Sequence, residues 1–133
     1  MSFEVGLELP AKTFKVTRED LIRYAGASLD FNKIHWNERV AKAVGLPNVI
    51  AHGMFTMGKC IQIVTDWIDN PAKVVDYQVR FASPVVVPDD DDGATVEVTA
   101  KIVENTGNKI KIDIQARSDG AKVLGKAVAI VQL

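Results

Sequence analysis

One aspartate and one histidine stand close enough along the chain to form an acid–base pair. Asp30 precedes His35 by five residues within a polar segment. Histidine changes charge near neutral pH, and a neighbouring carboxylate can orient or complement the imidazole. On a continuous helix the two side chains would point about 140° apart, so they converge only in an irregular loop, which Asn32 favours. The spacing alone also fits a helix-capping aspartate and an ordinary surface histidine.

A second group of interest is Ala51-His52-Gly53-Met54, where an apolar helix is expected to begin. The first amides of a helix have no internal partners, and this end of a helix carries partial positive charge. Because Gly53 has no side chain, the oxygen of a bound carbonyl could approach its N–H, which would stabilise developing negative charge. The alternative is that Gly53 only permits close packing of the helix on a sheet and that His52 caps the helix.

Three other binding patterns fit the sequence poorly. A structural zinc site needs four nitrogen or sulfur ligands, and the sequence offers His35, His52 and Cys60, so we expect no metal. Residues 53–60 nearly match a phosphate-binding loop, but Cys60 stands where a hydroxyl should meet magnesium, and the bulky residues between favour a helix. The acidic run 89–92 lacks the first and last ligands of an EF-hand loop, which predicts a solvated turn.

Three helices are expected in the first half of the chain, where they would position these groups. Thr17 begins the first helix, with acidic residues in the first turn, and Gly26 ends it. The second follows Asn37 and ends at Gly45. The third has apolar residues at spacings of three and four on a wide arc, so we expect it to be largely buried. The inward-facing residues are Val40, Ala41 and Val44 in the second helix and Met54, Met57, Ile61, Val64 and Ile68 in the third.

The second half alternates apolar and polar residues, which predicts β-strands with one buried face. The alternating stretches are 78–83, 95–102 and 109–117, with hairpin turns at 105–108 and 118–120. Residues 123–131 are apolar on both parities, which indicates a central strand or a subunit contact. Only the sheet is large enough to cover the third helix. We therefore predict an α+β fold in which a curved antiparallel sheet wraps around one long helix.

Length and composition limit the class of protein. The 133 residues predict one domain, 1–133, and 47% hydrophobic with 25% charged residues is typical of a folded globular chain. A net charge of −1 without a basic stripe argues against nucleic-acid binding. The first residues lack the features of a signal peptide, and no run approaches the roughly 20 apolar residues that span a bilayer. With a single cysteine, and so no intrachain disulfide, we expect a cytoplasmic protein without membrane contact.

Two segments match a known pair of motifs. They are Tyr24-Ala25-Gly26-Ala27-Ser28-Leu29-Asp30-Phe31-Asn32-Lys33-Ile34-His35-Trp36 and Ile50-Ala51-His52-Gly53-Met54, with Gly45-Leu46-Pro47 between them. Together they resemble the MaoC-like family of (R)-specific enoyl-thioester hydratases and 3-hydroxyacyl-thioester dehydratases. The family motif reads approximately Gly-Asp-x-Asn-Pro-aliphatic-His, followed by His-Gly-Met at a helix start. The resemblance covers nearly the whole chain and is strongest to the catalytic B subunit of actinobacterial 3-hydroxyacyl-ACP dehydratases.

The resemblance implies a hot-dog fold, in agreement with the packing argued above. It implies reversible hydration of trans-2-enoyl thioesters to (R)-3-hydroxyacyl thioesters of CoA or acyl carrier protein (ACP), in fatty-acid metabolism. By position, Asp30 and His35 would be the catalytic pair that activates a water. Gly53 would bind the thioester oxygen, with Asn32 and His52 in supporting places. No cofactor is implied, because the thioester acidifies C2, and members work as homodimers or as heterodimers with a second hot-dog subunit.

The chain departs from the usual motif at two positions. Leu29 replaces the glycine before the aspartate, and a bulky residue there implies a different turn or some strain. Lys33 replaces the proline. One alternative function is a non-catalytic acyl-binding subunit of a heterodimeric dehydratase, which would often lack the Asp30–His35 pair. Another is a hot-dog thioesterase, which would carry its carboxylate on or beside the long helix, whereas residues 54–65 contain no acid.

Overall fold

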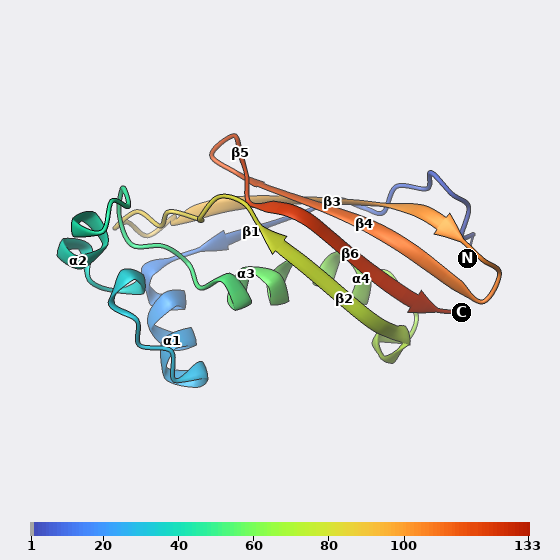
Figure 1. Cartoon of the computed structure of the whole chain (residues 1–133), viewed down its shortest axis with the longest axis horizontal. Coiled ribbons are helices and arrows are strands. Elements are labelled where there is room, and N and C mark those ends of the chain that lie inside the picture. Colours follow the sequence, from blue (N-terminus) through green and yellow to red (C-terminus); the bar gives the residue numbers. More distant parts are fainter. Residues whose placement is uncertain (1) are drawn as a thin grey trace.

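An antiparallel sheet and a set of helices on its inner side make up the computed structural model, which describes residues 2–133 (Figure 1). The helices α1 and α2 gather at one end of the sheet, and α3 and α4 lie beneath it. The elements in chain order are β1 (Lys12–Val16), α1 (Arg18–Ser28), the 3-10 helix η1 (Lys33–His35), α2 (Glu38–Ala43), α3 (Gly53–Cys60), α4 (Gln62–Thr65), the 3-10 helix η2 (Pro71–Lys73), β2 (Val74–Phe81), β3 (Ala94–Asn105), β4 (Lys109–Ser118), β5 (Ala121–Lys122) and β6 (Leu124–Gln132).

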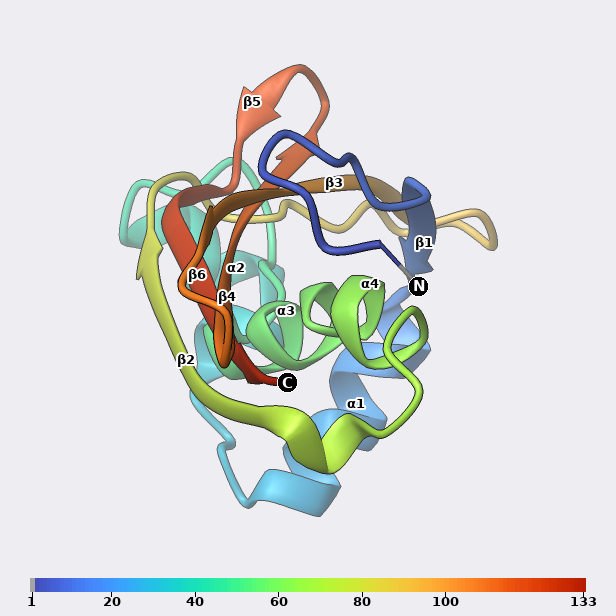
Figure 2. The same cartoon turned by 90° about the vertical axis from the view of Figure 1, so that its right-hand side faces the viewer.

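The sheet has the strand order β1-β3-β4-β6-β2, with β5 paired to β4. Figure 2 shows it curving around α3 and α4, which confirms the predicted α+β hot-dog fold. The period-two pattern correctly predicts the buried faces of β3 and β4. The apolar run near the C-terminus forms β6, an interior strand between β4 and β2, so one of the two predicted alternatives is confirmed. The strands at the two edges of the sheet are β1 and β2. The sequence pattern did not predict β1 or β5.

The long helix is divided into α3 and α4 at Ile61, which keeps helical angles (φ −65°, ψ −17°). Its predicted buried face is confirmed at Val64 and Ile68, is only half-buried at Met57 and Ile61, and is wrong at the start of α3. Met54, expected inside, is 63% exposed, whereas Thr56 is buried. Apolar residues occupy most of the helix surface, so their spacing could not define the face that meets the sheet. α4 ends at Thr65, and Ile68 is buried in the turn that follows.

The first two helices begin as predicted but differ in detail. Thr17 caps α1 through a capping box with Asp20. The prediction that Gly26 ends α1 is wrong: the helix continues to Ser28, because one internal glycine weakens a helix by only about 1 kcal/mol. Asn37 caps α2, and Gly45 follows it with φ +94°, as expected. Val44 was predicted to be buried but is 63% exposed, because it lies beyond the last turn of α2.

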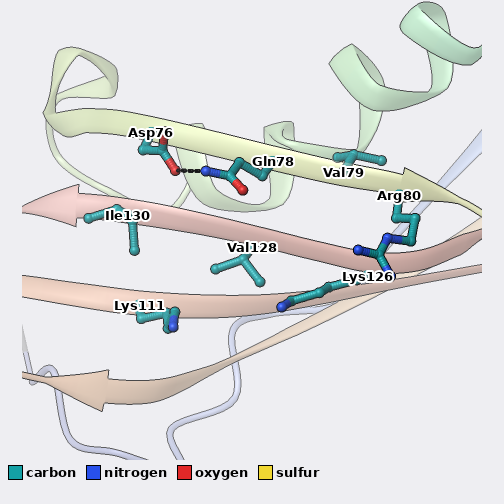
Figure 3. Close-up of a pocket in the computed structure, with 8 residues that line it drawn as sticks. All are labelled: Asp76, Gln78, Val79, Arg80, Lys111, Lys126, Val128 and Ile130. Atoms are coloured by element: carbon teal, nitrogen blue, oxygen red, sulfur yellow. Dashed lines mark hydrogen bonds between the residues drawn. The ribbon is translucent and has the colours of Figure 1, made fainter.

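The core lies between the inner face of the sheet and α3–α4, and its largest fully buried residues come from both. The outer face carries a shallow hollow over β2, β6 and β4, lined by charged and polar side chains together with Val79, Val128 and Ile130 (Figure 3). Arg80 and Lys126 face each other across two adjacent strands in this hollow. In residues 2–133 no helix is long and apolar enough to cross a membrane.

Candidate functional site

The segment between α1 and α2 forms a tight loop that brings Asp30 to His35. The Asp30 side chain accepts a hydrogen bond from the amide of Asn32 at 3.1 Å, and the Asn32 side chain accepts one from the amide of Ile34 at 3.2 Å. These two turns lead into η1, which ends at His35. As a result, Asp30 Oδ2 lies 3.9 Å from His35 Nε2. The two side chains converge because the segment is an irregular loop. Their five-residue spacing would have kept them apart on a continuous helix.

A backbone carbonyl fixes the tautomer of His35. Its Nδ1–H donates to the carbonyl oxygen of Ile50 at 2.7 Å, which leaves the Nε2 lone pair directed towards Asp30. The His35 side chain is 8% exposed, whereas that of Asp30 is 52% exposed. Burial lowers the pKa of His35 below its ordinary value of 6.5 and is the largest influence. The bond to Ile50 and the Asp30 carboxylate oppose this lowering of the pKa, while His52 adds to it, so the net effect favours the neutral imidazole.

His52 lies between two other rings. It stacks on His35 with ring centroids 3.7 Å apart and an interplanar angle of 20°. Tyr24 meets it edge-on at 4.7 Å. His52 is the N-cap residue of α3 but makes no side-chain capping bond, so the expected alternative role as a cap is not present. Instead its Nε2–H donates to the backbone carbonyl of Asp30 at 3.1 Å.

Gly53 is the first residue of α3, and its amide has no acceptor within residues 2–133. It opens onto a cleft of about 320 Å³ whose lining is mainly apolar and includes His35 and Phe81. A Cβ on Gly53 would lie 3.1 Å from Cζ of Phe81, so the ring of Phe81 packs directly over the glycine. The absence of a side chain therefore serves both close packing and access to the amide, the two roles that the sequence left open.

The carboxylate and the two imidazoles form a compact group but are poorly arranged for a metal ion. Asp30, His35 and His52 each offer an atom within 4.8 Å of the others. Imidazole binds zinc in the plane of its ring at about 2.0–2.1 Å, and the planes of two stacked rings do not meet at such a point. Cys60 lies in the core, where burial raises the pKa of its thiol to about 12. This geometry favours proton transfer over metal binding.

The structure thus brings together four of the five residues singled out from the sequence: Asp30, Asn32, His35 and His52. Gly53 follows His52 and faces the same cleft as His35. Sequence reasoning missed three contributors, the Ile50 carbonyl, the Tyr24 ring and Phe81. A backbone carbonyl carries no residue signature, and Phe81 is far away in sequence. Tyr24 could have been found, because it is the aromatic residue with which the first motif begins.

Comparison with known proteins shows which domain family the chain resembles. The MaoC-like domain matches residues 4–118. The 3-hydroxyacyl-thioester dehydratase X of Mycobacterium tuberculosis is 40% identical over 79 residues, 59% of this chain and 27% of that protein. The (R)-specific enoyl-CoA hydratase of Rhodospirillum rubrum is 33% identical over 95 residues, 71% of this chain and 64% of that one.

Comparison with solved structures also finds a MaoC-like protein. A MaoC-like dehydratase superposes with a TM-score of 0.93 and 38% identity, over 98% of this chain and 40% of that chain. The chain therefore spans about a quarter of the first curated relative and two fifths of this solved chain. Since the domain match covers most of residues 2–133 and the fold agrees, the chain belongs to the MaoC-like domain family.

Proposed function

We propose that this chain catalyses the reversible addition of water to trans-2-enoyl thioesters, giving (R)-3-hydroxyacyl thioesters. The observation that carries this proposal is the pair of proton acceptors, Asp30 Oδ2 and His35 Nε2, held 3.9 Å apart beside an apolar cleft. The names of its relatives, a hydroxyacyl-thioester dehydratase and an (R)-specific enoyl-CoA hydratase, support the reaction and its stereochemistry.

The pair is suited to activating one water molecule. His35 Nε2 is an acceptor because Nδ1 holds the proton for Ile50, and an ionised carboxylate also only accepts. Two acceptors cannot bond to each other, but both can accept from the same water, whose oxygen then turns a lone pair towards C3 of the substrate. As the C–O bond forms, one member of the pair takes a water proton, and C2 receives a proton from the pair.

The N-terminus of α3 would stabilise the intermediate charge. When water oxygen adds to C3, the electrons of the C2–C3 double bond move towards the thioester oxygen and form an enolate. The Gly53 amide has no acceptor among the described residues and lies at the positive end of α3, so it is placed to donate to that oxygen. The electrons return when C2 is protonated, which completes the addition without any further reagent.

A second hot-dog domain would complete the cleft. Large apolar side chains are exposed beside the site: Phe31 in the catalytic loop (58%), Met54 (63%) and Phe81 (50%). β2, whose Phe81 lines the cleft, is an edge strand with one side unpaired within residues 2–133. Clustered exposed apolar residues indicate an interface. The partner would be a second copy, another hot-dog subunit or a further domain of a longer chain, as the length of the relatives suggests.

The reaction is tested with the purified protein and short and long trans-2-enoyl-CoA and enoyl-ACP substrates. We expect reversible loss of enoyl absorbance without release of free thiol. Asp30→Asn and His35→Ala should each lower kcat by at least about 10²-fold, the usual contribution of general acid–base catalysis. Release of thiol would instead indicate a thioesterase. Acyl binding without turnover, with or without a partner, would indicate a non-catalytic subunit, and near-wild-type rates in either variant would contradict the assigned pair.

A further inference from the structure

The catalytic loop has one hydrogen bond to the start of the buried helix. The neighbouring residues Ile34 and His35 bond to the backbone of Ile50. Other hydrogen bonds of residues 29–33 within the described chain run to residues 25–37, that is, within the loop and the helix turns beside it. The exception is the bond from His52 Nε2 to the carbonyl oxygen of Asp30. His52 is 2% exposed, whereas Asp30 and Asn32 are exposed, so this bond joins a solvated loop to the core.

The ring of His52 is itself held in one orientation. His35 stacks on it, and Tyr24 contacts it edge-on at 4.7 Å. A carbonyl can only accept, so Nε2 of His52 must carry the proton. Its Nδ1 is buried and has no hydrogen-bond partner within residues 2–133, so the lone pair on that nitrogen serves no structural contact. The hydrogen bond of this ring within the described residues is therefore the one from Nε2–H to the backbone of Asp30, the residue that carries the proposed catalytic carboxylate.

We propose that His52 is the positioning residue that sets the separation of Asp30 and His35. One rigid ring contacts both members of the pair: it bonds to the backbone of Asp30 and stacks on the imidazole of His35. Because its Nε2–H holds the Asp30 carbonyl, the carboxylate stays at 3.9 Å from Nε2 of His35. This inference rests on the proposed hydratase activity for its kinetic consequence, but not for its structural one.

Two substitutions separate the hydrogen bond from the ring. His52→Gln keeps an N–H donor at a similar distance from the backbone but removes the stacked ring. His52→Phe keeps a ring for stacking but leaves the Asp30 carbonyl without its donor. We expect His52→Phe to lower kcat by about 10²-fold, with KM changed much less, because displacing a catalytic group by about 1 Å has effects of that size. His52→Gln should recover at least about half of that loss on a logarithmic scale.

Trp36→Phe is a matched control. It removes the other side-chain bond to a loop carbonyl, from Trp36 Nε1 to Phe31 at 3.0 Å, without touching Asp30. If the site depended on loop rigidity in general, this variant would lose as much activity as His52→Phe. We expect it to retain wild-type kcat. Thermal unfolding of all three variants separates loss of positioning from loss of fold.

Amide hydrogen exchange tests the same proposal without activity. The amide of Asn32 bonds to Asp30 Oδ1, so release of Asp30 should speed its exchange in His52→Phe and not in His52→Gln. Equal kcat and equal exchange in His52→Phe and His52→Gln, or wild-type values in His52→Phe, would overturn the proposal. An inactive wild-type protein would refute the hydratase assignment, and the exchange rates would still decide the role of His52.

Discussion

The role assigned to Gly53 can be tested by removing its N–H while keeping the helix. Gly53 is the first residue of α3, the position at which proline is best tolerated, because an amide there has no intrahelical acceptor. The preceding residue must be extended, and His52 already has φ −60° and ψ 135°. Gly53→Pro should therefore fold with the native helix and lack the proposed oxyanion donor.

The added ring also brings a Cβ, which needs its own control. A Cβ on Gly53 would lie 3.1 Å from Cζ of Phe81, and this half-exposed ring must move by a few tenths of an ångström. Gly53→Ala introduces the same contact and retains the N–H. Loss of one oxyanion donor lowers kcat by about 10²–10³-fold, or roughly 3–4 kcal/mol. We therefore expect kcat of Gly53→Pro to be lower than that of Gly53→Ala by this factor.

The assay is the initial rate of hydration of a short trans-2-enoyl-CoA, with kcat and KM measured for both variants. Circular dichroism and thermal unfolding check that the two variants have the same helix content and closely similar stability. Equal kcat values for two well-folded variants would refute the reasoning, because the N–H is the intended difference between them. In that case the loss shared by both would be assigned to the contact with Phe81.

Three further perturbations follow from the structure. Because burial lowers the pKa of His35 in the folded state, the acid limb of the pH profile of kcat/KM should have its midpoint below 6.5. For the same reason the free energy of unfolding, measured by urea titration, should fall as the pH drops from 6.5 through the folded-state pKa. Lys126→Glu puts a negative charge directly across from the positive charge of Arg80 on the neighbouring strand (Figure 3). It should stabilise the fold by about 0.2–1 kcal/mol at low salt, and added salt should diminish this gain. Leu29→Gly should raise the free energy of unfolding by about 0.5–1 kcal/mol, because Leu29 has φ +63° and glycine adopts this conformation without strain.

The strands could be predicted from sequence because their signal is local. In β3 and β4 each inward side chain is apolar and nearly each outward one is polar, so a period of two defines both the strand and its buried face. The turns at Gly107 and Gly120 have positive φ, as their residue types indicated. The order of the strands follows from pairings between distant segments, for which the sequence pattern carries no comparable signal.

The candidate site was predictable in its residues but not in its contacts. The spacing of Asp30 and His35 required an irregular loop, and the structure has one. The partner of His35 Nδ1 is the carbonyl of Ile50, which any residue at that position would supply. Phe81 reaches Gly53 only because β2 and α3 are brought together by the fold. Such contacts depend on tertiary packing, which no local pattern encodes.

The two departures from the usual motif show why the loop keeps its shape. Leu29 takes the left-handed conformation expected of the glycine that it replaces, at φ +63°, and its side chain is 75% exposed, so strain is present without a packing conflict. Lys33 is the first residue of η1 and replaces a proline, which has no backbone N–H. The added N–H of Lys33 has no acceptor within residues 2–133, so it changes no hydrogen bond. Neither replacement removes a hydrogen bond that the loop uses. The turns made by the side chains of Asp30 and Asn32 remain, as do the bond from His52 to the Asp30 carbonyl and the bond from His35 to the Ile50 carbonyl, so Asp30 and His35 stay side by side.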